Sequence, residues 1–218
     1  MGWPFGRKSK DRQEGPKTAK SGEPEIQRSP ALASLLGELK GGRVEILDLG
    51  SAIGANVEFL APLGCKLYIE DLYAALSNRQ PHGPDGEIAG AEFFAEFLSL
   101  PDDVRFDAIF AWDLFNYLKR EELAHFAAHL RRYCRPGTRI FALISYLKQM
   151  PAQPLRFRFH DEGSLVYERR TAGERPSPRL ATSELPDLLG GDFRVDRSFL
   201  LRNGFQEYLL VNEALAHG

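Results

Sequence analysis

An apolar run that begins at Val44 ends in Asp48, and Gly50, Ala52 and Gly54 then follow at every second position. Glycine lets backbone N–H groups approach a ligand closely, and a helix that follows such a loop presents its positive N-terminal end. The binding of a nucleotide-like ligand is the chemistry that this pattern favours. The alternative is a tight turn between a strand and a helix, in which the glycines serve packing alone.

Two common nucleotide-binding loops do not fit the spacing. The phosphate-binding P-loop requires Gly-Lys-Ser/Thr, which is absent from this segment. The dinucleotide fingerprint requires Gly-x-Gly-x-x-Gly, whereas Gly50, Ala52 and Gly54 stand at every second position. The spacing therefore excludes a P-loop and disfavours a dinucleotide loop, so a nucleotide-dependent oxidoreductase is a weaker hypothesis.

The elements that would position this loop alternate between strands and helices. Apolar runs predict buried strands, and 3.6-residue periodicity predicts helices. The strands are expected at 44–49, 66–70, 106–112 and 138–146, and the helices at 31–39, 55–63, 72–78 and 120–133. This alternation indicates βαβ units, a mostly parallel sheet and helices on both faces. Near the C-terminus, 193–201 and 205–211 flank Asn203-Gly204, which is a strong hairpin signal.

The loop sequence Asp-Leu-Gly-Ser-Ala-Ile-Gly resembles the Asp-x-Gly-x-Gly-x-Gly signature of class I S-adenosylmethionine (AdoMet)-dependent methyltransferases, with Ala52 at the middle glycine. The resemblance covers roughly residues 44–211. It implies an α/β fold with a doubly wound, mostly parallel seven-stranded sheet that ends in an antiparallel hairpin. It also implies that the loop packs against the methionine end of AdoMet, with Asp48 near the ammonium group. The loop residues expected to bind this cofactor are Asp48, Gly50, Ser51, Ala52, Gly54 and Asn56.

An acidic pair ends the second predicted strand. The family places a carboxylate here, and a carboxylate can accept hydrogen bonds from both ribose hydroxyls. Glu70 fits the spacing of the family better, and Asp71 is a close alternative. Asp71 also suits the N-cap of the following helix.

The segment 91–101 is ambiguous. The resemblance implies a third strand there, with Glu96 and Phe97 near the adenine. However, Phe93, Phe94 and Phe97 are spaced for one face of a helix, so a helix is at least as well supported.

Candidate catalytic residues follow the predicted strand 106–112. Methyl transfer depends mainly on positioning, and a general base helps when the acceptor is a hydroxyl or a protonated amine. Asp113 is the candidate base and Tyr117 its orienting partner, although Asp113 also suits a turn. Trp112 is expected either to face the cofactor or to lie in the core. His160 is a second catalytic candidate, although a lone histidine is more often a surface residue.

The chain is expected to have a disordered basic tail at 1–30 and a methyltransferase domain at 31–218. The tail carries seven lysines and arginines against four acidic residues. Low hydrophobicity makes such a segment unable to offset the entropy of ordering. Within the domain, 147–180 is an insert that contains six arginines, including Arg156, Arg158 and Arg170. It is expected to be a lid over an anionic acceptor or, more commonly for such segments, a solvated arm.

Composition supports a soluble enzyme-sized domain. The 218 residues are 43% hydrophobic and 27% charged, with a formal net charge of −2. Neither membrane-spanning runs nor Cys-x-x-Cys metal patterns occur, and a cytoplasmic location is expected. We therefore expect an AdoMet-dependent methyltransferase for a small, anionic acceptor, with no bound metal. A nucleic-acid or protein acceptor and a non-catalytic module of the same fold are the alternatives, and the oligomeric state is open.

Overall fold

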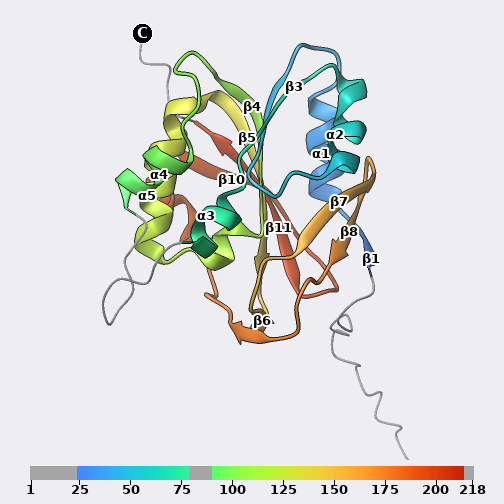
Figure 1. Cartoon of the computed structure of the whole chain (residues 1–218), viewed down its shortest axis with the longest axis vertical. Coiled ribbons are helices and arrows are strands. Elements are labelled where there is room, and N and C mark those ends of the chain that lie inside the picture. The colour runs from blue at the N-terminus through green and yellow to red at the C-terminus, as the bar shows by residue number, and fades with distance from the viewer. Residues whose placement is uncertain (1–23, 79–89, 214–218) are drawn as a thin grey trace, which may run out of the picture.

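The structure is a computed structural model, which describes residues 24–78 and 90–213 of the chain. Its centre is a sheet of six strands in the order β10-β11-β5-β4-β2-β3 (Figure 1). The strands are β2 (Glu45–Asp48), β3 (Lys66–Ile69), β4 (Phe106–Trp112), β5 (Cys134–Ser145), β10 (Phe193–Leu200) and β11 (Phe205–Asn212). β2 to β5 run parallel, whereas β10 and β11 form the predicted antiparallel hairpin.

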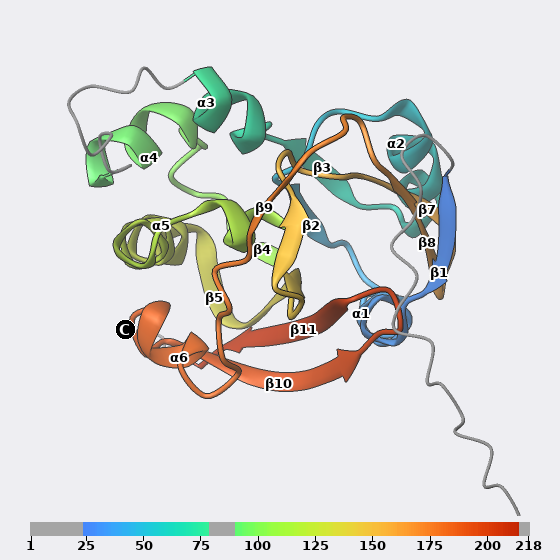
Figure 2. The same cartoon turned by 90° about the horizontal axis from the view of Figure 1, so that it is seen from below.

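Helices cover both faces of this sheet, as predicted (Figures 1 and 2). One face carries α1 (Pro30–Glu38), α2 (Gly54–Leu60) and the short helix η1 (Ala61–Leu63). The other carries α3 (Leu72–Asn78), α4 (Ala91–Phe97), α5 (Arg120–Leu130), α6 (Leu185–Leu188), η2 (Leu114–Tyr117) and η3 (Arg131–Tyr133). Alternation along β4 supplies both cores, because Phe110 and Trp112 face α1 whereas Ile109 and Ala111 face α5.

The prediction of a seven-stranded sheet is wrong for the described residues. The segment expected to hold a further strand forms α4 instead. Phe94 and Leu98, four residues apart, are both fully buried, and Phe94 packs on Phe126 of α5 with ring centroids 5.6 Å apart. The helical spacing of the aromatic residues therefore prevails over the strand that the family resemblance implies.

The insert forms β6 (Gln149–Pro151), β7 (Arg156–Asp161), β8 (Ser164–Glu168) and β9 (Glu174–Pro176). β7 alternates as its sequence suggests, with Phe157 and Phe159 buried and Arg156 exposed. Phe159 stacks on Phe59 of α2, with the ring centroids 4.7 Å apart. The apolar face of β7 thus attaches the insert to the domain.

Part of the predicted tail is ordered. Residues Glu25–Arg28 form β1, which pairs with the edge of β8 in a three-stranded sheet of order β1-β8-β7. The prediction of disorder is therefore wrong for these residues, because the open edge of β8 supplies backbone hydrogen-bond partners that composition does not reveal. The remainder of the predicted tail, 1–23, lies outside the described residues. No described helix is long and apolar enough to cross a membrane.

Candidate functional site

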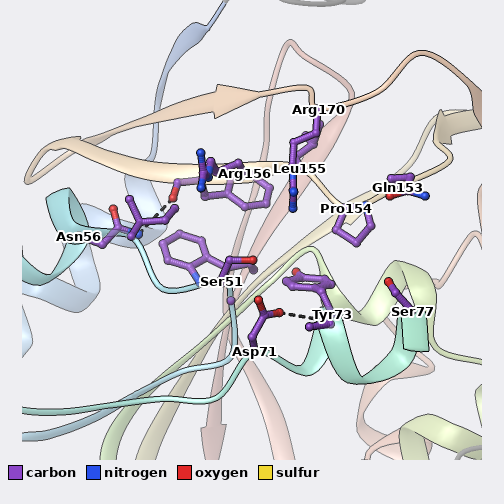
Figure 3. A pocket seen from close by; sticks show the side chains of 15 residues that line it. Ser51, Asn56, Asp71, Tyr73, Ser77, Gln153, Pro154, Leu155, Arg156 and Arg170 are labelled. Carbon is purple, nitrogen blue, oxygen red and sulfur yellow. Dashed lines mark hydrogen bonds between the residues drawn. The ribbon is translucent and has the colours of Figure 1, made fainter. Parts of the chain in front are cut away.

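A cavity of about 450 Å³ lies beyond the carboxyl ends of β2, β3 and β4 (Figure 3). In the sheet, β3 lies on one side of β2 and β4 lies on the other, so the direction of strand succession reverses between β2 and β4. Open α/β sheets bind ligands at such a switch point. The loop after β2 contributes Gly50, Ser51 and Ile53 to the cavity wall, and α3 contributes Ala74 and Ser77.

Asp48, Gly50 and Trp112 form a tightly packed floor between β2 and β4. The Asp48 carboxylate accepts hydrogen bonds from the Gly50 N–H at 2.9 Å and from the Trp112 indole N–H at 2.6 Å. A Cβ on Gly50 would lie only 2.9 Å from Cδ1 of Trp112. Burial raises the pKa of Asp48 to about 6, partly offset by these two hydrogen bonds. The close packing of Trp112 therefore requires glycine at position 50 even when no ligand is bound.

Trp112 has an unusual backbone conformation, with φ at +49°. The left-handed region is unfavourable for a bulky non-glycine residue, and such strain is concentrated at functional sites. The conformation is held by the hydrogen bond to Asp48 and by parallel stacking of the indole on Phe157, with centroids 5.4 Å apart and planes 3° apart. Trp112 is 2% exposed, as expected for a core residue, and it also lines the cavity.

Of the acidic pair after β3, Asp71 lines the cavity and Glu70 does not. One carboxylate oxygen of Asp71, Oδ1, accepts the N–H of Ala74 at 3.0 Å and so caps the first turn of α3. Glu70 is half-buried, and burial raises its pKa. Of the two sequence alternatives, Asp71 is thus the residue that reaches the cavity, and it also caps α3.

Asp113 lies behind the cavity wall and is connected to it through Tyr73. It is 1% exposed, its Oδ1 accepts the Tyr73 hydroxyl at 2.6 Å, and its Oδ2 accepts the N–H of Leu155 at 3.1 Å. Burial raises the pKa of Asp113 to about 7, although the hydrogen bonds from Tyr73 and Leu155 oppose this shift. Burial and the neighbouring Asp113 raise the pKa of Tyr73 well above its usual range, so Tyr73 remains a neutral phenol.

Comparison with known proteins identifies the family. A family model described as "Methyltransferase domain" matches residues 17–172, which is more than half of the chain. The chain belongs to this methyltransferase family. The resemblance to class I AdoMet-dependent enzymes is thereby confirmed, and AdoMet is the cofactor of the family. No curated protein matches the sequence.

Solved structures show the same fold. An S-adenosylmethionine-dependent methyltransferase from Clostridium acetobutylicum superposes with a TM-score of 0.50 at 15% identity, covering 84% of this chain and 91% of that one. The PH0226 protein from Pyrococcus horikoshii gives 0.50 at 14% identity, covering 84% and 88%. The 1,6-didemethyltoxoflavin-N1-methyltransferase of Burkholderia thailandensis gives 0.48 at 18% identity, covering 85% and 77%. At these identities the similarity is one of fold.

The other predicted cofactor residues of the methyltransferase are distributed around the cavity rather than gathered in it. Asp48 lies beneath the lining. Ala52 and Gly54 are exposed on the loop and at the start of α2, outside the lining. Asn56 lines the cavity, but its amide is engaged by β7, since Nδ2 donates to the Phe157 carbonyl and Oδ1 accepts the Phe159 N–H, each at 3.1 Å. Asn56 therefore attaches the insert to α2.

Four further predicted residues lie outside the cavity lining. Glu96 and Phe97 are exposed on α4, the helix that replaces the expected strand. His160 is exposed near the end of β7. Tyr117 donates its hydroxyl to the Pro151 carbonyl at 3.2 Å, and it also lies close enough to Asp113, its expected partner, to oppose the rise in the pKa of that carboxyl. The structure supports no contact of these four side chains with a ligand in this cavity.

Sequence reasoning missed Tyr73, and for the insert it offered a lid as one of two alternatives without identifying Pro154 and Leu155 as lining residues. Tyr73 lies in α3 two residues after Asp71 and is indistinguishable in sequence from an apolar residue of the helix face. Pro154, Leu155 and Arg156 lie opposite Asp71 and Tyr73 across the cavity, and Arg170 of the insert also lines it (Figure 3). The arginine content of the insert was the only signal for this wall.

Proposed function

We propose that this methyltransferase binds AdoMet in the cavity at the β2/β4 switch point and methylates a small anionic acceptor there. One observation carries the proposal: Gly50 from the loop after β2, Asp71 after β3 and Trp112 at the end of β4 all line one cavity. These are the three places at which the class I resemblance implies cofactor contacts. The volume of about 450 Å³ lies within the usual range for small-molecule pockets.

The lining residues suit the chemical groups of AdoMet. The Asp71 carboxylate can accept hydrogen bonds from vicinal ribose hydroxyls. The Trp112 indole stacks on Phe110 and Phe157 and is 2% exposed, so it gives the cavity a rigid apolar floor rather than an open aromatic face. When bound, AdoMet supplies an electrophilic methyl group on its sulfonium sulfur.

We further propose that Tyr73 and Asp113 accept the proton that the methyl acceptor loses. The acceptor proton passes to the Tyr73 oxygen while the Tyr73 proton passes to Asp113 Oδ1, to which it is already hydrogen-bonded at 2.6 Å. An acid with a pKa of about 7 is well suited to take up a proton near neutral pH. Asp113 is thus a positioning residue and proton store behind Tyr73.

The acceptor class follows from the cavity's charged side chains. Asp71 is the acidic residue of the lining, and Arg156 and Arg170 are its basic residues. No salt bridge joins either arginine to another residue within 24–78 or 90–213. Guanidinium groups bind carboxylates and phosphates through paired N–H donors. If Asp71 binds ribose, the two arginines remain to bind an anionic acceptor.

Calorimetry with AdoMet tests the cofactor site through a matched pair of variants. Asp71→Asn retains an oxygen that can cap α3 but removes the charge, and we expect AdoMet affinity to fall about tenfold or more, as expected for loss of a charge-assisted hydrogen bond. Glu70→Gln, the adjacent control, should leave the affinity unchanged. A loss of affinity in Glu70→Gln alone would show that Glu70, and not Asp71, binds the ribose. The absence of any binding heat from the wild type at millimolar AdoMet would contradict the proposal that this cavity binds the cofactor.

The anionic acceptor is tested by transfer from methyl-labelled AdoMet into paired small carboxylates and their neutral amides. We expect label in the carboxylates. Arg156→Gln and Arg170→Gln should each raise the acceptor KM about tenfold, the equivalent of one weakened ionic hydrogen bond, without changing AdoMet affinity. Arg158→Gln, on the same strand but outside the lining, is the control. Preferential labelling of the amides would contradict the proposal.

A further inference from the structure

A second, smaller cavity of about 70 Å³ lies between the insert and the hairpin turn that joins β10 to β11. Tyr167 of β8, Arg169 and Asn203 line it together with apolar side chains. Leu155 lines both this cavity and the larger one, so a single side chain belongs to both walls. The small cavity is therefore adjacent to the cavity that the proposed function uses.

Three buried polar atoms of these residues have no hydrogen-bond partner: Tyr167 Oη, Arg169 Nε and Asn203 Nδ2. Tyr167 is only 5% exposed, and the Asn203 amide lies beside its hydroxyl without hydrogen-bond geometry between them. Leaving a buried polar group unpaired costs about 1–3 kcal/mol, and native proteins pair nearly all of them. Three such atoms around one cavity indicate a group that binds there.

Two of the three unpaired atoms, on Asn203 and Arg169, are donors because of their other contacts, and the third, the neutral Tyr167 hydroxyl, can donate. Asn203 Oδ1 accepts the Phe205 N–H at 3.2 Å, which leaves the NH₂ group for the cavity. Arg169 donates a terminal guanidinium N–H to the Gly173 carbonyl at 2.6 Å, which leaves its Nε–H. Burial keeps the Tyr167 phenol protonated. The complementary group must therefore be a hydrogen-bond acceptor.

The charge around the small cavity favours a neutral acceptor over an anion. Arg169 already lies 3.8 Å from Glu174, and Glu25 is a second carboxylate of the lining. These two carboxylates outweigh the one guanidinium, so an anion would meet net repulsion. The apolar part of the lining consists of Leu147, Met150, Pro151, Leu155 and Phe205.

We propose that the small cavity binds a neutral carbonyl group, of the amide, lactam or ketone class, at one end of the methyl acceptor. A carbonyl oxygen accepts from the three donors while its carbon substituents contact the apolar side chains. A volume of about 70 Å³ holds one such group rather than a whole acceptor. The assignment of this group to the methyl acceptor rests on the proposed function, in which Arg156 and Arg170 bind the anionic end.

Acetamide and acetate, which have the same size and differ in charge, are suitable probes. In full-length ¹⁵N-labelled protein, we expect acetamide to shift the Asn203 side-chain NH₂ signals saturably, whereas acetate does not. These signals are identified by their absence from Asn203→Asp, which keeps an oxygen for the Phe205 N–H. Tyr167→Phe deletes only the unpaired hydroxyl and should weaken acetamide binding at least fivefold.

Tyr146→Phe is the control, because the Tyr146 hydroxyl donates to the Leu201 carbonyl at 2.9 Å and lies outside the small cavity. The inference is overturned if acetamide produces no saturable shift, if acetate binds as well, or if Tyr167→Phe binds acetamide like the wild type. AdoMet calorimetry separates this result from the proposed function. If the protein binds AdoMet but not acetamide, only the proposal for the small cavity is contradicted. If it binds acetamide but not AdoMet, the proposed function is contradicted, and with it the assignment of the carbonyl group to a methyl acceptor.

Discussion

Replacing Gly50 with alanine is expected to lower AdoMet affinity by about 10- to 100-fold, the equivalent of the 1–3 kcal/mol that overpacking of a core costs. The added methyl would lie 2.9 Å from Cδ1 and 3.0 Å from Nε1 of Trp112, and 3.2 Å from a carboxylate oxygen of Asp48. Real Cβ atoms do not approach so closely, so Trp112 must move. Its movement breaks the hydrogen bond to Asp48 and the stack on Phe157 that shape the cavity floor.

Gly54→Ala is the matched control in the same loop signature. No atom outside its neighbours lies within 4 Å of a Cβ at Gly54, and the residue does not require a positive φ. Because Gly54 begins α2, alanine should even stabilise the fold slightly. AdoMet calorimetry and thermal unfolding of both variants measure the difference. Equal losses in the two variants would show that the glycines act on the ligand directly, against the packing argument.

Replacing Asp113 with asparagine is expected to abolish most methyl transfer while stabilising the protein at pH 8. Asparagine cannot take up the proton that Tyr73 passes on, and loss of such proton transfer costs typically about 10²- to 10⁴-fold in rate. AdoMet affinity should be unchanged, because Asp113 lies outside the cavity lining. Transfer from labelled AdoMet into a small-molecule extract, followed against pH, measures this effect.

The stabilisation follows from the raised pKa of Asp113, about 7 in the folded protein against an ordinary value of 3.8. The folded state holds the proton to a higher pH than the unfolded state, so this group's stabilising effect is complete below about pH 4. It is lost as pH rises through about 7, at a cost of up to about 4 kcal/mol. Asparagine at position 113 does not titrate, so it does not lose stability in this way. Denaturant unfolding should therefore show a smaller fall in the free energy of unfolding between pH 4 and 8 for Asp113→Asn than for the wild type.

Tyr73→Phe distinguishes a proton path from a purely structural role of Asp113. If the proton passes through Tyr73, this variant should lose about as much activity as Asp113→Asn, and the double variant should lose little more, since the two residues act as one unit. The wild-type rate should also fall below about pH 7, and this dependence should vanish in Asp113→Asn. Full activity of Asp113→Asn at pH 8 would exclude the proposed path.

The local features of this methyltransferase could be predicted from the sequence. The strand that ends at Asp48, the loop around Gly50, the alternation of strands with helices and the Asn-Gly hairpin all depend on residues near one another in the chain. Hydrophobic periodicity and turn-forming residues act over such short ranges, so these elements can be predicted without knowledge of the tertiary structure. The same short-range spacing also supported the helix at α4, against the strand that the family pattern implies.

The composition of the cavity was decided by tertiary packing. Which of Glu70 and Asp71 lines it depends on where the chain turns into α3, and the Tyr73 hydroxyl is fixed by Asp113, which follows β4 about 40 residues later in the chain. The far wall comes from an insert about 100 residues away in sequence, attached to α2 through Asn56. Contacts between such distant segments arise from complementary surfaces that form only on folding. The sequence therefore determined the family and the loop around Gly50, whereas the folded structure determined which side chains line the cavity.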